Sequence, residues 1–296
     1  MTEIPHSKEI TAKVGDIEIT YDTFGDPSAP PMLLVMGLGA QMIRWDEAFC
    51  KALAAQGHWV IRFDNRDVGL SSKFDDGGVP DVMSLIQGEA VDVPYKLKDM
   101  ADDAIGLLDA LGIKEADVVG VSMGGMIVQT MAIHYPDRVR TLTSVMSSTG
   151  SPDLPQPTEE AMAALLAPPA SSRDEYIKNS LMSAKVLHGP HYPLDEDYVR
   201  NYSEISYDRC YHPPGFTRQL SAVIASGSRK EALGNIKIPT LVIHGDADPL
   251  VPVEGGKDTA KSIPEAELLI IEGMGHSFPT EVVPQILQAI LKHTAP

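Results

Sequence analysis

Short apolar runs recur along the chain, and each ends at a glycine or a polar residue. The runs that we expect to form buried strands are Met32–Met36, Trp59–Phe63, Val118–Val121, Leu142–Met146, Leu241–Ile243 and Leu268–Ile271. They are continuously apolar rather than alternating, which is typical of strands covered on both faces of a parallel sheet. Two earlier runs, Glu9–Val14 and Ile17–Phe24, flank the turn pair Gly15 and Asp16 and predict an opening hairpin.

Segments with apolar residues at helical spacing lie between the buried runs. The helices predicted in this way are Trp45–Gln56, Leu97–Leu111, Gly124–His134 and Val282–His293. Strands that alternate with helices build βα units. The pattern therefore predicts an α/β protein with a mostly parallel, doubly wound sheet.

The alternation of strands and helices breaks between residues 150 and 229. This segment is rich in Pro, Ser, Tyr and charged residues and contains helix-compatible stretches such as Thr158–Leu166 and Arg173–Leu187. It has no run of the buried-strand type, and the strand signal returns only at Ile238. We therefore expect a core of residues 1–149 and 230–296, with a mainly helical cap insertion, residues 150–229, over the carboxyl edge of the sheet.

Composition and charge narrow the functions that this chain can have. Hydrophobic residues make up 43% of the 296 residues and charged residues 22%, as in an ordinary globular protein with a sizeable core. The formal net charge of −17 disfavours nucleic acid as a partner, because binding it requires Lys and Arg to neutralise phosphates. An anionic membrane surface is disfavoured for the same reason.

Cysteine usage and the apolar stretches indicate a cytoplasmic location. Cys50 and Cys210 form neither a CxxC pair nor a disulfide framework, so a reducing compartment is expected. Residues 1–8 lack a basic region followed by an apolar run, so we expect no signal peptide. No stretch approaches the roughly 20 apolar residues that a membrane helix needs. The choice between a monomer and a homo-oligomer stays open.

The segment Gly120–Gly125 matches the Gly-x-Ser-x-Gly pattern of a nucleophile elbow around Ser122. An apolar run precedes it and a predicted helix follows it, as a tight strand-to-helix turn requires. Small residues two positions before and after the serine are needed because a side chain there would collide with the neighbouring backbone. This context favours a nucleophilic serine over an inert serine in a glycine-rich turn.

A serine hydroxyl needs a base, and the base needs an orienting acid. In proteins that carry a nucleophilic serine on such an elbow, the chain order is serine, acid, histidine. Asp248 follows the apolar run that ends at Ile243, and we prefer it to Asp246 because the spacing Gly-x-x-Asp leaves room for a turn. His276 lies between small residues beyond the last predicted strand. Ser122, Asp248 and His276 are therefore the predicted catalytic triad.

Other readings of these residues carry less weight. The sequence His244-x-Asp-x-Asp could suggest a metal site, but no further grouping of His and Asp completes a ligand set, so we expect no metal and no cofactor. His244 is expected to pack or hydrogen-bond near the acid loop. The histidines of the insertion, His188, His191 and His212, are expected to be surface or lining residues.

A tetrahedral oxyanion needs hydrogen-bond donors. The backbone N–H of Met123, directly after the serine, is one candidate. Gly37 and Leu38 follow the first buried run, and the Leu38 N–H is the second candidate; a plain glycine-containing turn is the alternative reading. The segment Asp64–Ser71, with its carboxylates, guanidinium and glycine, is expected to organise a loop.

The order of these motifs resembles the α/β-hydrolase superfamily, over almost the whole chain. More narrowly, the chain resembles the aclacinomycin methylesterase group through Leu33–Gly37, Asp64–Ser71, Val119–Gly124 and Gly273–Pro279. The resemblance implies an α/β-hydrolase fold and hydrolysis of a carboxylic ester, with the same triad. Many superfamily members have His-Gly at the oxyanion loop where this chain has Met36-Gly37, a difference that the methylesterase group shares.

The leading hypothesis is a cofactor-free serine esterase that cleaves a carboxylic ester, including a methyl ester, of a small molecule. Thioesterases, lactonases, C–C hydrolases and perhydrolases use the same triad and stay open, as does a non-catalytic small-molecule receptor. In the insertion, aromatic rings with polar edges are suited to lining a pocket for a bulky ester. The residues of this set are Tyr198, Tyr202, Tyr207, Tyr211 and Phe216. Packing of the rings within the cap is the alternative for each.

Overall fold

The structure is a computed structural model, and it describes residues 4–295. Residues 1–3 and 296 lie outside the described residues. Two predictions extend into them: the absence of a signal peptide, which concerns residues 1–8, and the two ends of the predicted core. The strands are β1 (Ile10–Val14), β2 (Ile17–Phe24), β3 (Pro31–Val35), β4 (Trp59–Phe63), β5 (Ala116–Val121), β6 (Val139–Val145), β7 (Thr240–Gly245) and β8 (Glu267–Ile271).

These strands form one sheet in the order β1-β2-β4-β3-β5-β6-β7-β8. β1 pairs with β2 and β2 with β4 in antiparallel register, and all later pairs are parallel. The predicted hairpin and the mostly parallel sheet are thus confirmed. The continuous apolar runs have their expected cause, because Leu33 and Val118 lie in one buried cluster and Leu34 and Val119 in another, on opposite faces of the sheet.

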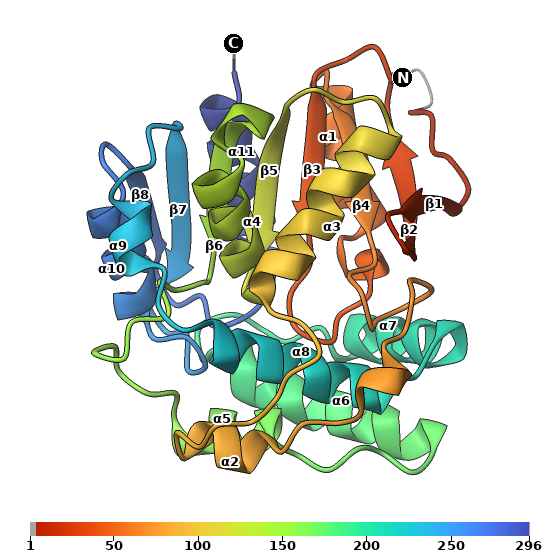
Figure 1. The fold of residues 1–296 in the computed structure, drawn as a ribbon, viewed down its shortest axis with the longest axis vertical. Helices are drawn as coiled ribbons and strands as arrows, with labels where there is room; N and C mark the ends of the chain where they lie inside the picture. The colour runs from red at the N-terminus through yellow and green to blue at the C-terminus, as the bar shows by residue number, and fades with distance from the viewer. Residues whose placement is uncertain (1–3, 296) are drawn as a thin grey trace.

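Helices cover both faces of the sheet. The helices of the core are α1 (Glu47–Ala55), α2 (Val82–Ile86), α3 (Leu97–Ala110), α4 (Met123–His134), α9 (Lys230–Leu233), α10 (Val253–Ser262) and α11 (Val283–His293). Figure 1 shows α3 and α4 in front of the sheet, with α1 and α11 behind it. The structure therefore has the doubly wound α/β-hydrolase arrangement that the sequence predicted.

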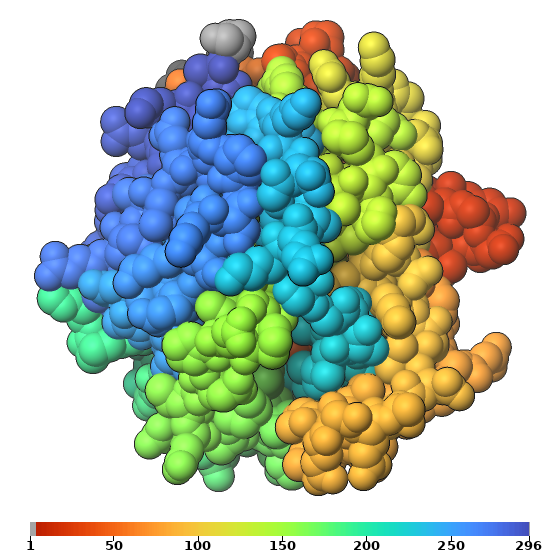
Figure 2. Space-filling view, turned by 60° about the vertical axis from the view of Figure 1, so that its left-hand side comes forward, coloured from red at the N-terminus to blue at the C-terminus, as the bar shows by residue number. Residues whose placement is uncertain are grey.

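Of the five helices between β6 and β7, the first four lie inside the predicted insertion, and α9 follows it. The first four are α5 (Glu159–Leu165), α6 (Arg173–Leu187), α7 (Glu196–Arg209) and α8 (Pro213–Ser226). In Figure 1 they lie below the sheet, where the arrowheads of the parallel strands point. The space-filling view shows this green-to-teal segment as the lower part of the molecule, bordered by the orange segment that carries α2 (Figure 2). We call α5 to α8 the cap; its limits at residues 150 and 229 stay a prediction.

The cap is joined to the core by buried ion pairs. Arg218 of α8 makes two hydrogen bonds of 2.8 Å with the carboxylate of Asp67, in the loop after β4, and the two side chains are 1% and 0% exposed. Arg209 at the end of α7 pairs with the buried carboxylate of Asp64 at 2.7 Å. The segment Asp64–Ser71 is therefore the loop organiser that the sequence suggested, and two of its carboxylates have arginine partners in the cap.

We expect Arg218→Met to destabilise the protein by about 3–5 kcal/mol, because it leaves the Asp67 carboxylate buried without its cation. Arg173→Met is the matched control, because the Arg173–Asp208 pair at 2.8 Å has exposed partners and contributes weakly. The measurement is the unfolding free energy from urea titrations followed by circular dichroism. Equal losses in the two variants would show that the Asp67 pair does not clamp the cap.

Candidate active site

Ser122 directly follows the last residue of β5, Val121, and directly precedes the first residue of α4, Met123. Ser122 has φ 55° and ψ −119°, a left-handed conformation that costs a non-glycine residue about 1–3 kcal/mol. Two contacts hold it in place: its N–H donates to the Val145 carbonyl at 2.9 Å, and the Ser147 hydroxyl donates to its carbonyl at 2.8 Å. The strain turns the side chain of Ser122 out of the strand at the carboxyl edge of the sheet.

The two glycines around Ser122 are required by close backbone contacts. A Cβ on Gly120 would overlap the carbonyl of Gly124. A Cβ on Gly124 would in turn overlap the carbonyl of Val35 at the end of β3. This is the reason that the sequence pattern implied for small residues at these positions.

The structure brings Ser122, His276 and Asp248 together. The Ser122 hydroxyl lies 2.9 Å from Nε2 of His276, and Nδ1 of His276 lies 2.7 Å from Oδ2 of Asp248. The carboxylate accepts the hydrogen on Nδ1, which leaves Nε2 free to accept from the serine hydroxyl. Asp248 comes from the loop after β7 and His276 from the loop after β8, so three strand ends supply the three side chains.

Asp248 sits in an environment that keeps it ionised. Its Oδ1 accepts the N–H groups of Leu250 and Val251 at 2.9 and 2.8 Å. Burial alone would raise the pKa of Asp248, but the nearby His276, the contact with His244 and the backbone donor of Val251 hold that pKa well below its usual value. A carboxylate in this state can orient and stabilise an imidazolium.

Two neighbours of Asp248 hold the loops of the site. His244 is fully buried, and its Nε2 lies 2.7 Å from the Val251 carbonyl and 3.5 Å from Oδ2 of Asp248, which confirms its predicted place beside the acid loop. Asp246 does not contact His276 through any hydrogen bond of the described residues. Its Oδ1 accepts the N–H of Gly273 at 2.6 Å and so ties the loop of β7 to that of β8.

The loop of residues 36–39, which we call the oxyanion loop, passes directly over Ser122. A Cβ on Gly37 would lie 3.2 Å from Cβ of Ser122 and 3.8 Å from its hydroxyl oxygen. The N–H groups of Leu38 and Met123 make no backbone hydrogen bond within the described part of the chain. Met123 directly follows Ser122, and Leu38 directly follows the glycine that contacts it, so the role of both N–H groups as oxyanion donors stays a prediction.

The cap tyrosines have neighbours of their own. Arg44 stacks on the rings of Tyr198 and Tyr202, with its guanidinium carbon 5.5 and 4.7 Å from the ring centroids. Tyr207 and Tyr211 stack on each other with centroids 4.9 Å apart. Tyr207 and Tyr211 thus pack within the cap, whereas Tyr198 and Tyr202 pack on Arg44 of the core. For these four rings the pocket-lining role stays a prediction.

Phe216 differs from the four tyrosines because it contacts the oxyanion loop. A Cβ on Gly39 would run into its ring, so Phe216 of α8 packs directly against that glycine. Of the five aromatic residues singled out in the cap, Phe216 is the one that the structure sets beside the predicted oxyanion donors.

The cap also holds the loops of His276 and Asp248, which sequence analysis missed. At the end of α6, the Leu187 carbonyl accepts the N–H of His276 at 2.6 Å and the His188 ring contacts the Ser277 hydroxyl at 2.9 Å. The N–H of Thr158 donates to the Pro249 carbonyl at 2.9 Å. Most of these contacts use backbone atoms, which leave no signature in the residue types.

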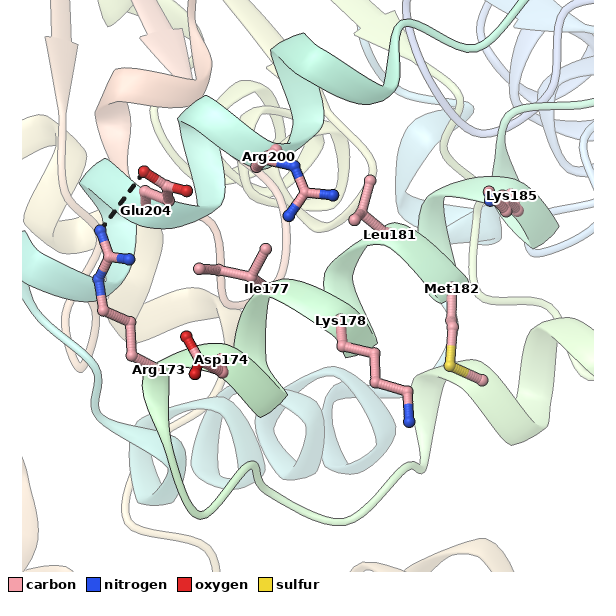
Figure 3. A pocket seen from close by; sticks show the side chains of 9 residues that line it. All are labelled: Arg173, Asp174, Ile177, Lys178, Leu181, Met182, Lys185, Arg200 and Glu204. Carbon is pink, nitrogen blue, oxygen red and sulfur yellow. Dashed lines mark ion pairs between the residues drawn. The ribbon is translucent and has the colours of Figure 1, made fainter.

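A hollow of about 440 Å³ lies elsewhere, on the outer side of the cap between α6 and α7. Its lining includes Ile177, Leu181 and Arg200, and Figure 3 shows Arg173 extended toward Glu204, with which it pairs at 3.5 Å. None of the predicted triad residues lines this hollow. The chemistry of the site is therefore separate from it.

Two further features concern metals and membranes. Among residues 4–295, no group of three or more His, Cys, Asp or Glu side chains is placed to hold a metal ion. Within the same range, no helix has both the length and the apolar character needed to cross a membrane.

Fold, strand order and site all point to one family, and comparison with known families agrees. The family model described as alpha/beta hydrolase fold matches residues 30–281. The chain belongs to this family.

Two groups of relatives differ in their printed activities. A rhodomycin D methylesterase of Streptomyces sp. (strain C5) is 30% identical over 94% of this chain and 95% of its own, and one of Streptomyces peucetius is 29% identical over the same shares. The 3-oxoadipate enol-lactonase 2 of Acinetobacter baylyi is 25% identical over 90% of this chain and 89% of its own. The resemblance to methylesterases that the motifs suggested is confirmed.

Solved structures agree on the fold. The 2-hydroxy-6-oxo-6-phenylhexa-2,4-dienoate hydrolase of Rhodococcus sp. strain RHA1 superposes with a TM-score of 0.77 at 20% identity, over 98% of this chain and 99% of its own. At this identity the likeness concerns the fold alone.

We expect a fluorophosphonate probe to label Ser122, and Asp248→Asn to slow labelling by about 10⁴-fold because the amide favours the wrong imidazole tautomer. Asp246→Asn is the matched control. It keeps an acceptor for Gly273 and should slow labelling far less. Labelling rates are followed by intact-mass spectrometry, and peptide mapping locates the modified serine. A larger loss in the Asp246 variant would assign the acid to the wrong aspartate.

Proposed function

We propose that this enzyme hydrolyses a carboxylic ester of a small molecule through an acyl-enzyme on Ser122. The observation that carries the proposal is the pair of contacts at His276, 2.9 Å to the Ser122 hydroxyl and 2.7 Å to Asp248. A serine, a base and an orienting carboxylate in this geometry are the parts that acyl transfer needs.

In the first half of the reaction, the Ser122 oxygen attacks the ester carbonyl carbon while Nε2 of His276 takes the hydroxyl proton. The resulting imidazolium is stabilised by Asp248. The carbonyl oxygen becomes an oxyanion, which the N–H groups of Leu38 and Met123 bind. Collapse of this intermediate breaks the bond to the alcohol oxygen, and His276 returns the proton to the departing alcohol.

In the second half, water replaces the alcohol. His276 takes a proton from the water as its oxygen attacks the acyl carbon, and the same two N–H groups bind the second oxyanion. Collapse releases the carboxylic acid and returns the proton to the Ser122 oxygen. The cycle uses no electron carrier and consumes one water for each ester bond.

The relatives support a methyl ester as the substrate. Two rhodomycin D methylesterases align with 94% of this chain, so the cap is included in the alignment. We propose that residues 150–229 form the part of the enzyme that selects the acyl group, because they cover the strand ends that carry Ser122, Asp248 and His276. The net charge of −17 favours a neutral ester over an anionic one.

We expect Ser122→Ala to abolish hydrolysis of esters, with a loss of roughly 10⁴-fold or more in kcat, because the nucleophile is removed. The fold should persist, because the half-buried hydroxyl leaves no core cavity. Ser84→Ala, in the short helix α2, is the control for purification and handling. Initial rates on methyl esters, aryl esters, thioesters and lactones identify the preferred bond. Wild-type turnover by pure Ser122→Ala would disprove the mechanism.

We expect Phe216→Ala to change the ratio of kcat/KM on bulky and small esters by about tenfold, because the ring lies against the oxyanion loop. The four tyrosines are tested by the same substitution, with smaller shifts where the ring packs on Arg44 or on another tyrosine. Thermal melting of each variant separates lost selectivity from lost stability. If all five variants keep the wild-type ratio, the cap aromatic residues do not select the substrate.

A further inference from the structure

The oxyanion loop is fastened at both of its ends. On the side before Gly37, the amide of Asn65 donates to the Met36 carbonyl at 3.0 Å. On the side after Leu38, the N–H of Gly39 donates to Oε1 of Gln219 at 2.8 Å. The first fastening comes from the core, in the loop after β4, whereas the second comes from α8 of the cap.

Gln219 has the features of a fixed support rather than of a surface contact. It is fully buried, and its amide is used at both ends, because Nε2 donates to the Arg66 carbonyl at 2.7 Å. The two backbone partners are a donor and an acceptor, so they allow one orientation of the amide. Gln219 therefore spans the space between the oxyanion loop and the loop after β4.

The neighbours of Gln219 on α8 restrict the same contact. Arg218 anchors the helix through Asp67. Phe216, one turn before Gln219, packs on Gly39. Gly39 has φ 66°, a left-handed conformation that favours glycine, and in this conformation its N–H donates to Gln219. Support on both sides of Leu38 leaves its N–H little freedom to turn.

We propose that Gln219 is a positioning residue for ester hydrolysis: from the cap, it fixes the oxyanion loop so that the Leu38 N–H points at the developing oxyanion. The inference rests on the proposed function, since it assigns a role within that mechanism. Gln219 does not touch the reacting atoms. It acts through Gly39, and it makes the cap a part of the machinery that stabilises the transition state.

The test is Gln219→Met, which has a similar length but neither donor nor acceptor. We expect kcat to fall by about 10- to 100-fold, because a donor displaced by about 1 Å loses much of its effect in the transition state. KM should change by less than about threefold, because a ground-state carbonyl depends less on this donor. A trifluoromethyl ketone analogue, which forms a tetrahedral adduct with serine, should bind more weakly by a factor similar to the fall in kcat.

Gln129→Met is the matched control. Gln129 of α4 is also fully buried and also uses both ends of its amide, with the Ser144 hydroxyl and the Arg229 guanidinium at 3.1 Å. The same substitution should cost comparable thermal stability there, yet leave kcat/KM within about threefold of wild type. A merely structural role of Gln219 predicts the same kinetic result for both variants.

Three results would overturn the inference: wild-type kcat in Gln219→Met, an equal loss of kcat in both variants, or a loss of kcat without weaker binding of the ketone. Ser122→Ala is measured alongside. If it is inactive while Gln219→Met is normal, only the inference fails, whereas an active Ser122→Ala enzyme means that the proposed function fails. If Gln219→Met does not fold, Gln219→Ser leaves room for a water beside Arg66 and Gly39, and the same readouts decide.

Discussion

Burial of two carboxylates in the loop after β4 is the constraint on which the joining of core and cap depends. Asp64 and Asp67 are fully buried or nearly so, and buried charges are tolerated only when they are paired and hydrogen-bonded. Backbone donors satisfy part of this need: Asp64 accepts the N–H groups of Met42 and Leu70 at 2.8 and 2.9 Å. The cations come from Arg209 and Arg218 of the cap. Without Arg209 and Arg218 both carboxylates would lose their ion-pair partners, so the cap stabilises the loop after β4.

This attachment changes what the cap does for the site. A lid held only by apolar contacts could open without disturbing the loops beneath it. This cap makes hydrogen bonds to each of them: to the oxyanion loop through Gln219, to the His276 loop through Leu187 and to the Asp248 loop through Thr158. The strained backbone of Ser122 is held by the core itself, through Val145 and Ser147. The cap therefore supports the loops that surround the serine, whereas the core holds the serine.

Sequence patterns predicted the sheet and the site more fully than the cap. β2, β4 and α6 have the bounds that apolar periodicity gave, because each lies between clear turn or cap residues. α7 was missed because only Val199, Ser203 and Ser206 of it are buried, which leaves no apolar stripe. The prolines that begin α8 are a helix-start signal that the sequence analysis did not use. Ser122, Asp248 and His276, which the structure brings together, could be singled out because their motifs are local. The contact of Gln219 with Gly39 spans 180 residues and has no local pattern. The same separation explains why the segment Asp64–Ser71 was assigned to a loop without its arginine partners.

Helix α8 shows how one element can combine support with selectivity. Arg218 and Gln219 are buried and committed to the core, so a change at either disturbs the loops of the site. Phe216 is half-buried and lies against Gly39 of the oxyanion loop. Substitution there alters the shape next to the reacting carbonyl while the two supports keep their bonds. The outer surface of α6 and α7 neither supports the loops of the site nor contacts Ser122, and Ser122 does not line its hollow. The proposed selectivity is therefore expected at cap positions such as Phe216, which contact the loops of the site without a hydrogen bond to them.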